Sequence, residues 1–154
     1  MLGLRPKIVE VTLSLDTNIY AANDLLADTQ VVSNAFYDID KPGVLDSVYV
    51  IDEDDQTAVP IVLYLLSDSG SLGTENSALN PTDAVARTIL GTVPILAADF
   101  KDLINSKAAT IKNIGLIVKP KTGTRDLYIA AALDGAGTPT YTASGIKVRL
   151  GIRS

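Results

Sequence analysis

The chain has 154 residues, a length typical of a single domain, and contains neither histidine nor cysteine. Without these side chains it cannot form a Ser-His-Asp or Cys-His catalytic site, a disulfide, a structural zinc site or a thiolate redox centre, so we expect no enzyme, no metal and no cofactor. The net charge of −5 is opposite to that of most nucleic-acid-binding proteins, and no apolar run approaches the ~20 residues that span a bilayer. We therefore expect neither nucleic acid nor membrane as a partner.

The first elements follow from a proline and from strict alternation. Pro6 ends a short N-terminal arm, residues 1–6, and residues 7–154 form a single domain without a linker. Apolar residues occupy every second position from Val9 to Leu15. This pattern predicts a half-buried strand at residues 9–15.

Further strands are predicted where apolar and β-branched residues cluster between turn residues. They cover residues 26–36, 44–51, 59–66, 93–97, 100–104, 114–118 and 127–132. The run at 59–66 is almost continuously apolar, which is typical of a strand buried on both faces.

One helix is predicted at residues 81–90. Asn80 can cap it, Pro81 suits its first position, and Gly91 would end it. A final strand is predicted at residues 146–152, where apolar residues again take every second position. Many short strands at regular spacing, with one short helix, predict an all-β fold, a jelly-roll-like β-sandwich.

Charge is distributed unevenly along the chain. Residues 1–100 hold 4 basic and 15 acidic side chains, a net charge of −11, whereas residues 101–154 hold 9 basic and 3 acidic ones, a net charge of +6. Two interpretations stay open: an uneven solvated surface, or acidic and basic faces that meet between subunits. In the second, the acidic loop at residues 52–55 would contact Lys147, Arg149 or Arg153 of a neighbouring subunit.

Two local patterns have a chemical interpretation. Asp52-Glu53-Asp54-Asp55 could hold a cation, but it lacks the glycine and glutamate spacing of an EF-hand loop, and a solvated loop fits it better. Ser144 and Lys147 have the S-x-x-K spacing of serine–lysine acyl enzymes, which need both side chains one helical turn apart. The alternation after Gly145 predicts a strand, which would point the two side chains to opposite faces. No catalytic, metal-binding or cofactor-binding residues are therefore predicted.

Five stretches of the chain resemble small proteins encoded in the structural regions of tailed phages. They are VTLSLDTNIY (11–20), DLLADTQ (24–30), VIDEDDQ (50–56), LGTENSA (72–78) and PTYTASGIKVRLG (139–151). The similarity spans nearly all residues after the N-terminal arm, and the family offers no catalytic residues to transfer. Such proteins are similar to capsid decoration, or cement, proteins, which commonly sit as trimers on the outer shell.

The resemblance implies a viral structural protein that binds major capsid protein subunits and stabilises the outer surface of a tailed-phage capsid. It further implies a homotrimer that is made in the host cytoplasm and located on the outer capsid surface of the virion. The alternative is a carbohydrate- or host-surface-binding module of a virion or fibre. Tyr20, Tyr37, Tyr49 and Tyr141 could stack on sugars in such a module, although an isolated tyrosine more often lies at the rim of a core.

Overall fold

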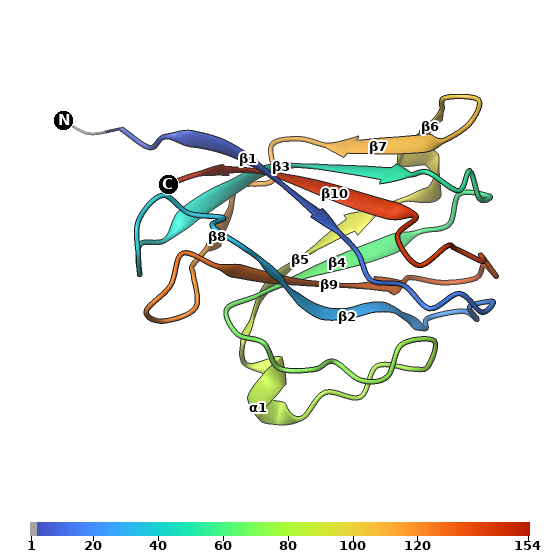
Figure 1. Ribbon diagram of the computed structural model, residues 1–154, viewed down its shortest axis with the longest axis horizontal. Coiled ribbons are helices and arrows are strands. Elements are labelled where there is room, and N and C mark those ends of the chain that lie inside the picture. The colour runs from blue at the N-terminus through green and yellow to red at the C-terminus, as the bar shows by residue number, and fades with distance from the viewer. Residues whose placement is uncertain (1–2) are drawn as a thin grey trace.

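A computed structural model describes residues 3–154 and shows two β-sheets packed face to face (Figure 1). Within these residues the strands are β1 (Pro6–Thr12), β2 (Leu25–Val32), β3 (Gly43–Asp52), β4 (Ile61–Leu66), β5 (Ile89–Ile95), β6 (Phe100–Asp102), β7 (Lys107–Ile111), β8 (Leu116–Val118), β9 (Leu127–Leu133) and β10 (Ile146–Arg153). The helical elements are α1 (Asp83–Ala86) and the 3-10 turn η1 (Ala97–Asp99). None of the helices in this part of the chain is long and apolar enough to cross a membrane.

The order of the strands is that of a jelly roll. The larger sheet has the order β1-β10-β3-β7-β6, with β8 also paired to β3, and the smaller sheet has the order β2-β9-β4-β5. β1 pairs with β10, β2 with β9, β3 with β7 and β8, and β4 with β5, each in antiparallel orientation. The first half of the chain therefore folds back along the second half as one long hairpin wrapped into two layers. This arrangement confirms the predicted all-β, jelly-roll-like sandwich with one short helix.

Alternation along the terminal strands places the core between the sheets. Every second residue of β10 is buried, as predicted for residues 146–152. β1 begins at Pro6, before the predicted start at Val9, and ends at Thr12. Burial nevertheless continues beyond the end of β1, because Leu13 is 1% exposed and donates its backbone N–H to the carbonyl of Ile146 at 3.0 Å. The alternating pattern thus predicts burial more accurately than it predicts the ends of the strand.

The outer face of the smaller sheet is covered by the chain itself. Residues 67–88, which include α1, run below this face in Figure 1. Leu72 from this segment is fully buried in a second apolar cluster, separate from the core between the sheets. Its fully buried partners in the sheet are Leu25, Leu66 and Ala130. The smaller sheet is therefore packed on both of its faces.

The predicted helix at residues 81–90 is wrong in its extent. α1 is a single four-residue turn, and its N-cap is Thr82 rather than Asn80. The following residues form β5, because the apolar strand β4 gains a hydrogen-bonded neighbour there and this pairing outweighs local helix propensity. Gly91 does not end a helix but lies within β5, where a Cβ atom would lie only 2.7 Å from the Leu116 side chain.

Several other strand boundaries also differ from the prediction. β2 ends at Val32 rather than at residue 36, and β6 ends at Asp102 rather than at residue 104. The sequence pattern does not predict β7, whose segment KAATI contains two small alanines and little alternation. β4 is fully buried on its core face but only half-buried at Val62 and Tyr64, so the prediction of burial on both faces is wrong for these two residues.

The N-terminal boundary is defined by the partner of β1. Residues 1–2 of the predicted arm lie outside the described residues. Arg5 and Ser154 exchange two backbone hydrogen bonds, of 2.9 and 3.1 Å, so the chain is already aligned with β10 before β1 begins. The division into an arm, residues 1–6, and a single domain, residues 7–154, stays a prediction.

Candidate functional site

The acidic run at residues 52–55 ties together two loops at one end of the sandwich. The buried carboxylate of Asp52 accepts hydrogen bonds from the backbone N–H groups of Asp54 (2.8 Å) and Gln56 (2.9 Å). The Asp54 carboxylate in turn accepts from the backbone N–H of Thr142 at 2.8 Å. These carboxylates stabilise the loops, and nowhere in residues 3–154 do three or more acidic side chains form a group that could hold a metal ion.

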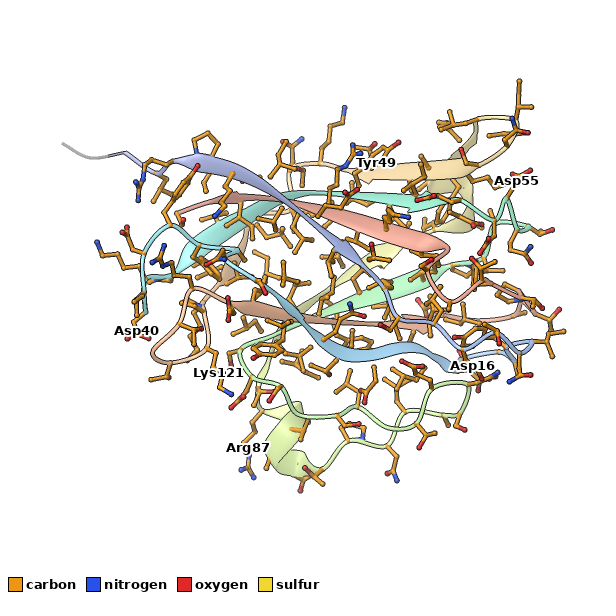
Figure 2. All side chains as sticks on the ribbon, in the orientation of Figure 1. Asp16, Asp40, Tyr49, Asp55, Arg87 and Lys121 are labelled. Carbon is orange, nitrogen blue, oxygen red and sulfur yellow. The ribbon has the colours of Figure 1, made fainter. Side chains whose placement is uncertain are left out.

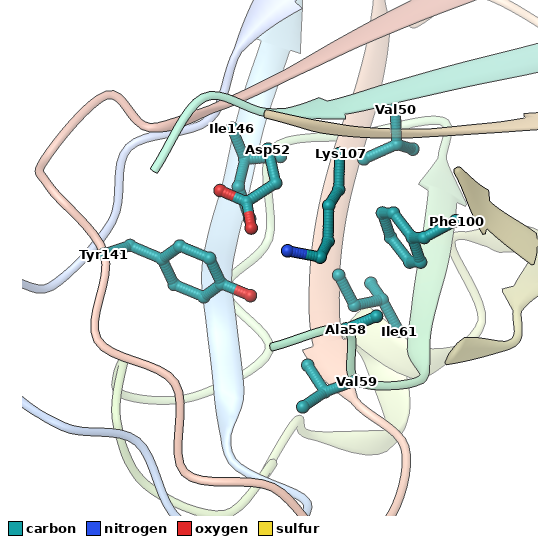
Figure 3. A pocket seen from close by; sticks show the side chains of 9 residues that line it. All are labelled: Val50, Asp52, Ala58, Val59, Ile61, Phe100, Lys107, Tyr141 and Ile146. Atoms are coloured by element: carbon teal, nitrogen blue, oxygen red, sulfur yellow. The ribbon is translucent and has the colours of Figure 1, made fainter. Parts of the chain in front are cut away.

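A small cavity lies beside Asp52 (Figure 3). The carboxylate of Asp52, the amine of Lys107 and the hydroxyl of Tyr141 point into it. Burial raises the pKa of Asp52, although its two backbone hydrogen bonds oppose the shift, and burial also raises the pKa of Tyr141. The cavity measures about 10 Å³, which is space for about one water molecule. Ligand pockets commonly measure about 300–1,000 Å³, so this acid, amine and phenol have no room for a substrate.

The S-x-x-K pair does not have the geometry of an acyl enzyme. Ser144 lies in the turn before β10, and Lys147 is the second residue of that strand. The Lys147 amine forms an ion pair with the carboxylate of Glu53. Neither residue lies in a helix, so the one-turn spacing that the chemistry requires is not formed.

The candidate tyrosines serve different parts of the fold. Tyr20 and Tyr141 are buried against each other, with ring centroids 6.2 Å apart. The ring of Tyr37 is covered by the Arg5 guanidinium, 4.3 Å from its centroid. Of these four tyrosines, Tyr49 is the one on a broad open surface, the outer face of the larger sheet. They do not gather into the exposed patch that the carbohydrate-binding alternative requires.

No segment of residues 3–154 covers the outer face of the larger sheet, in contrast to that of the smaller sheet (Figure 1). Glu10 of β1, Arg149 of β10 and Tyr49 of β3 stand side by side in one row across it. Apolar side chains lie on the same face at Ile8 in β1 and Ile117 in β8, which are 75% and 70% exposed. We name this surface the open face, and it is the candidate functional site.

Charges on and around the open face are paired within the chain. Arg149 lies 3.3 Å from the carboxylate of Glu10 and 5.3 Å from the ring centroid of Tyr49. Arg153 binds Asp46, and this hydrogen bond lowers the pKa of the carboxyl and raises that of the guanidinium. Such exposed pairs contribute only about 0–1 kcal/mol each, so they fix side-chain positions more than they stabilise the fold.

This pairing explains the uneven distribution of charge along the sequence. Five of the nine basic residues after position 100 form an ion pair with an acidic residue from the first 100. The pairs are Lys107–Asp55, Lys121–Asp68, Lys147–Glu53, Arg149–Glu10 and Arg153–Asp46. The jelly roll brings the two halves of the chain together, so the asymmetry requires no contact with a second subunit.

No family model matches the chain, and no curated protein matches it. Among solved structures, the chain is similar to one from Desmodium yellow mottle tymovirus, with 13% identity, a TM-score of 0.35 and coverage of 100% of this chain and 89% of that one. A chain of the Israeli acute paralysis virus full particle shows 15% identity, a TM-score of 0.31 and coverage of 97% and 70%. The fold assignment rests on the strand pairing alone.

The sequence pattern did not point to the open face. The one local signal is Ile8, an apolar residue at a position where the alternation of residues 9–15 requires a polar side chain. Ile117 gives no such signal, because β8 is three residues long and all of them are apolar. The open face can be recognised only from the strand pairing, because its residues come from distant parts of the sequence.

Proposed function

We propose that the chain is a viral structural protein that decorates and stabilises the outer surface of a tailed-phage capsid by binding major capsid protein subunits. One observation carries the proposal: a jelly roll that covers one sheet with its own chain and leaves the other sheet open. The acidic run and the S-x-x-K pair have structural partners instead of an accessible site. The resemblance of five sequence stretches to tailed-phage structural proteins supports the same function.

The open face suits binding to a large protein surface. Its ion pairs are already formed within the chain, so a partner meets fixed polar groups rather than long side chains that must first be ordered. Ile8 and Ile117 supply exposed apolar area at separate places on the face. Binding to the assembled shell alone stabilises that shell by mass action, by about 2.7 kcal/mol when the free protein is at 100 times its Kd.

The proposal includes three copies that are made in the host cytoplasm and bound around a three-fold position on the outer surface. A closed ring of three uses the same contact three times and matches the symmetry of such a position. Light scattering of the purified protein measures the number of copies, since a trimer has three times the mass of the 16.2 kDa chain.

Co-sedimentation with purified heads tests the function. The heads come from the phage that encodes the chain and are stripped of this protein. We expect the parent chain to sediment with heads, and the double variant Ile8→Lys, Ile117→Lys to bind at least about tenfold more weakly, which corresponds to ~1.4 kcal/mol. Ala86→Lys, on α1 at the covered side, is the matched control and should bind like the parent. Absence of parent binding would refute the function, and equal binding of the double variant would refute the open face as the site.

A further inference from the structure

The tip of the β6–β7 hairpin contains an unusual backbone conformation. Within residues 3–154, seven residues other than glycine have positive φ angles, and six of them are asparagine or aspartate, the residue types that tolerate this conformation best. The seventh is Ile104, with φ of 77°. A β-branched side chain is strongly disfavoured there, because its Cβ crowds the neighbouring backbone.

Ile104 is also one of the most exposed apolar residues of the chain. It is 82% exposed, and the adjacent Leu103 is 50% exposed. The hairpin extends from the larger sheet at the upper right of Figure 1, away from the rest of the sandwich. Asp102 holds the turn, since its carboxylate accepts the backbone N–H of Ile104 at 2.7 Å, and the N–H of Leu103 donates to the carbonyl of Ser106 at 2.8 Å. The tip is therefore an ordered turn that presents two aliphatic side chains to solvent.

Burial does not offset the strain, because the Ile104 side chain is exposed. The hydrogen bonds that hold the turn use the backbone N–H groups of Leu103 and Ile104, so an asparagine at this position would keep them and relieve the strain. Residues held in strained backbone conformations cluster at functional sites such as ligand clamps and switch regions. An apolar side chain on a rigid turn has the properties of an interface anchor, because little conformational entropy is lost when it is buried.

We propose that Leu103 and Ile104 form an apolar knob that inserts into an apolar pocket on a major capsid protein subunit. This inference rests on the proposed function and names one of its contacts. The hairpin belongs to the larger sheet, so the knob lies at the margin of the open face. A protein pocket fits better than a lipid surface. Two aliphatic side chains are a small area for insertion, no tryptophan is available, and the net charge of −5 repels anionic headgroups.

Ile104→Asn separates the role of the side chain from its effect on folding. Relief of the strain should leave the melting temperature unchanged or raise it by roughly 2–4 °C. Binding to the same heads should weaken at least about tenfold. Ile104→Val keeps an apolar side chain and should retain most of the binding. The matched control is Ile39→Asn, because Ile39 is 53% exposed and precedes Asp40 at the opposite end of the molecule (Figure 2).

The possible outcomes are distinct. Parent-like binding of Ile104→Asn would overturn the knob and leave the proposed function intact, whereas failure of the parent chain to bind heads would refute both. An equal loss of binding in Ile39→Asn would show that any exposed apolar residue contributes, which also overturns the specific knob. Flotation of the parent chain, but not of Ile104→Asn, with phosphatidylcholine–phosphatidylglycerol vesicles would identify lipid as the target and overturn the protein pocket.

Discussion

Replacement of Leu72 by alanine tests whether residues 67–88 close the outer face of the smaller sheet. Leu72 is 0% exposed and packs against Leu66 and Ala130, on the side of the sheet opposite the main core. Truncation of a buried leucine costs about 2–5 kcal/mol, because the transfer free energy is lost and a cavity remains. We expect about 3 kcal/mol here, a large part of the ~5–15 kcal/mol that stabilises a typical domain. For a chain of this length the melting temperature should fall by roughly 6–12 °C.

Urea unfolding followed by circular dichroism measures the change, since the chain has no tryptophan for fluorescence. Ile117→Ala on the open face is the control, and its 70% exposure predicts a change within about 0.5 kcal/mol. Similar small losses in the two variants would refute the reasoning. Residues 67–88 would then not be packed on the sheet, and the contrast between a covered and an open face would have no basis.

Two other substitutions test contacts that hold the loops. Gly145→Ala should destabilise the fold by about 1–3 kcal/mol in thermal melting, because a Cβ atom would collide with the Asp54 carboxylate; an unchanged melting temperature would contradict this. Tyr20→Phe should cost about 1–3 kcal/mol, since the phenol donates to the buried carbonyl of Leu26 and accepts from the backbone of Asp16, both at 2.8 Å. A loss below about 0.5 kcal/mol in urea unfolding would show that water replaces the phenol.

The sequence predicts the fold best where one face of a strand is buried. Apolar and polar residues alternate at 146–152 because β10 lies inside the larger sheet with one side on the core. Every second side chain therefore points into the core. The helix prediction at 81–90 depends on local signals around Asn80 and Pro81, which pairing of β5 with β4 overrides. Local conformational preferences are weak compared with the stabilisation that an apolar strand gains when it pairs with a neighbour.

The candidate site is less predictable because it is assembled from distant segments. The row formed by Glu10, Arg149 and Tyr49 joins three strands that are far apart in the sequence. The strain at Ile104 depends on a backbone angle that no composition pattern encodes. The acidic run at 52–55 is predicted to be a solvated loop, but Asp52 is buried at the end of β3. Neither this burial nor the hydrogen bond from Thr142 to Asp54 follows from the sequence pattern.

The edges of both sheets are protected against the addition of another strand. In the described chain, β6 is three residues long, β5 contains Pro94, which lacks a backbone donor, and residues 75–78 bind the outer edge of β2 at Leu25. The remaining edge strand is β1. Arg5 and Ser154 exchange reciprocal backbone hydrogen bonds. The backbone N–H and C=O groups of the odd-numbered residues of β1 therefore point toward β10, and those of the even-numbered residues point away from it, toward the free edge.

Two side chains occupy the ends of this outward edge. The Tyr37 hydroxyl donates to the carbonyl of Pro6 at 2.9 Å, and the Gln30 amide donates to the carbonyl of Thr12 at 2.7 Å and accepts from the N–H of Ser14 at 2.9 Å. The double variant Tyr37→Phe, Gln30→Ala frees these three backbone groups, so we expect it to self-associate beyond the state of the parent chain in sedimentation velocity experiments. Tyr37→Phe alone is the control, because Gln30 still blocks one end of the edge. Parent-like sedimentation of the double variant at every concentration would show that these side chains do not guard the edge, whereas association of the double variant, but not of Tyr37→Phe alone, would show that they do.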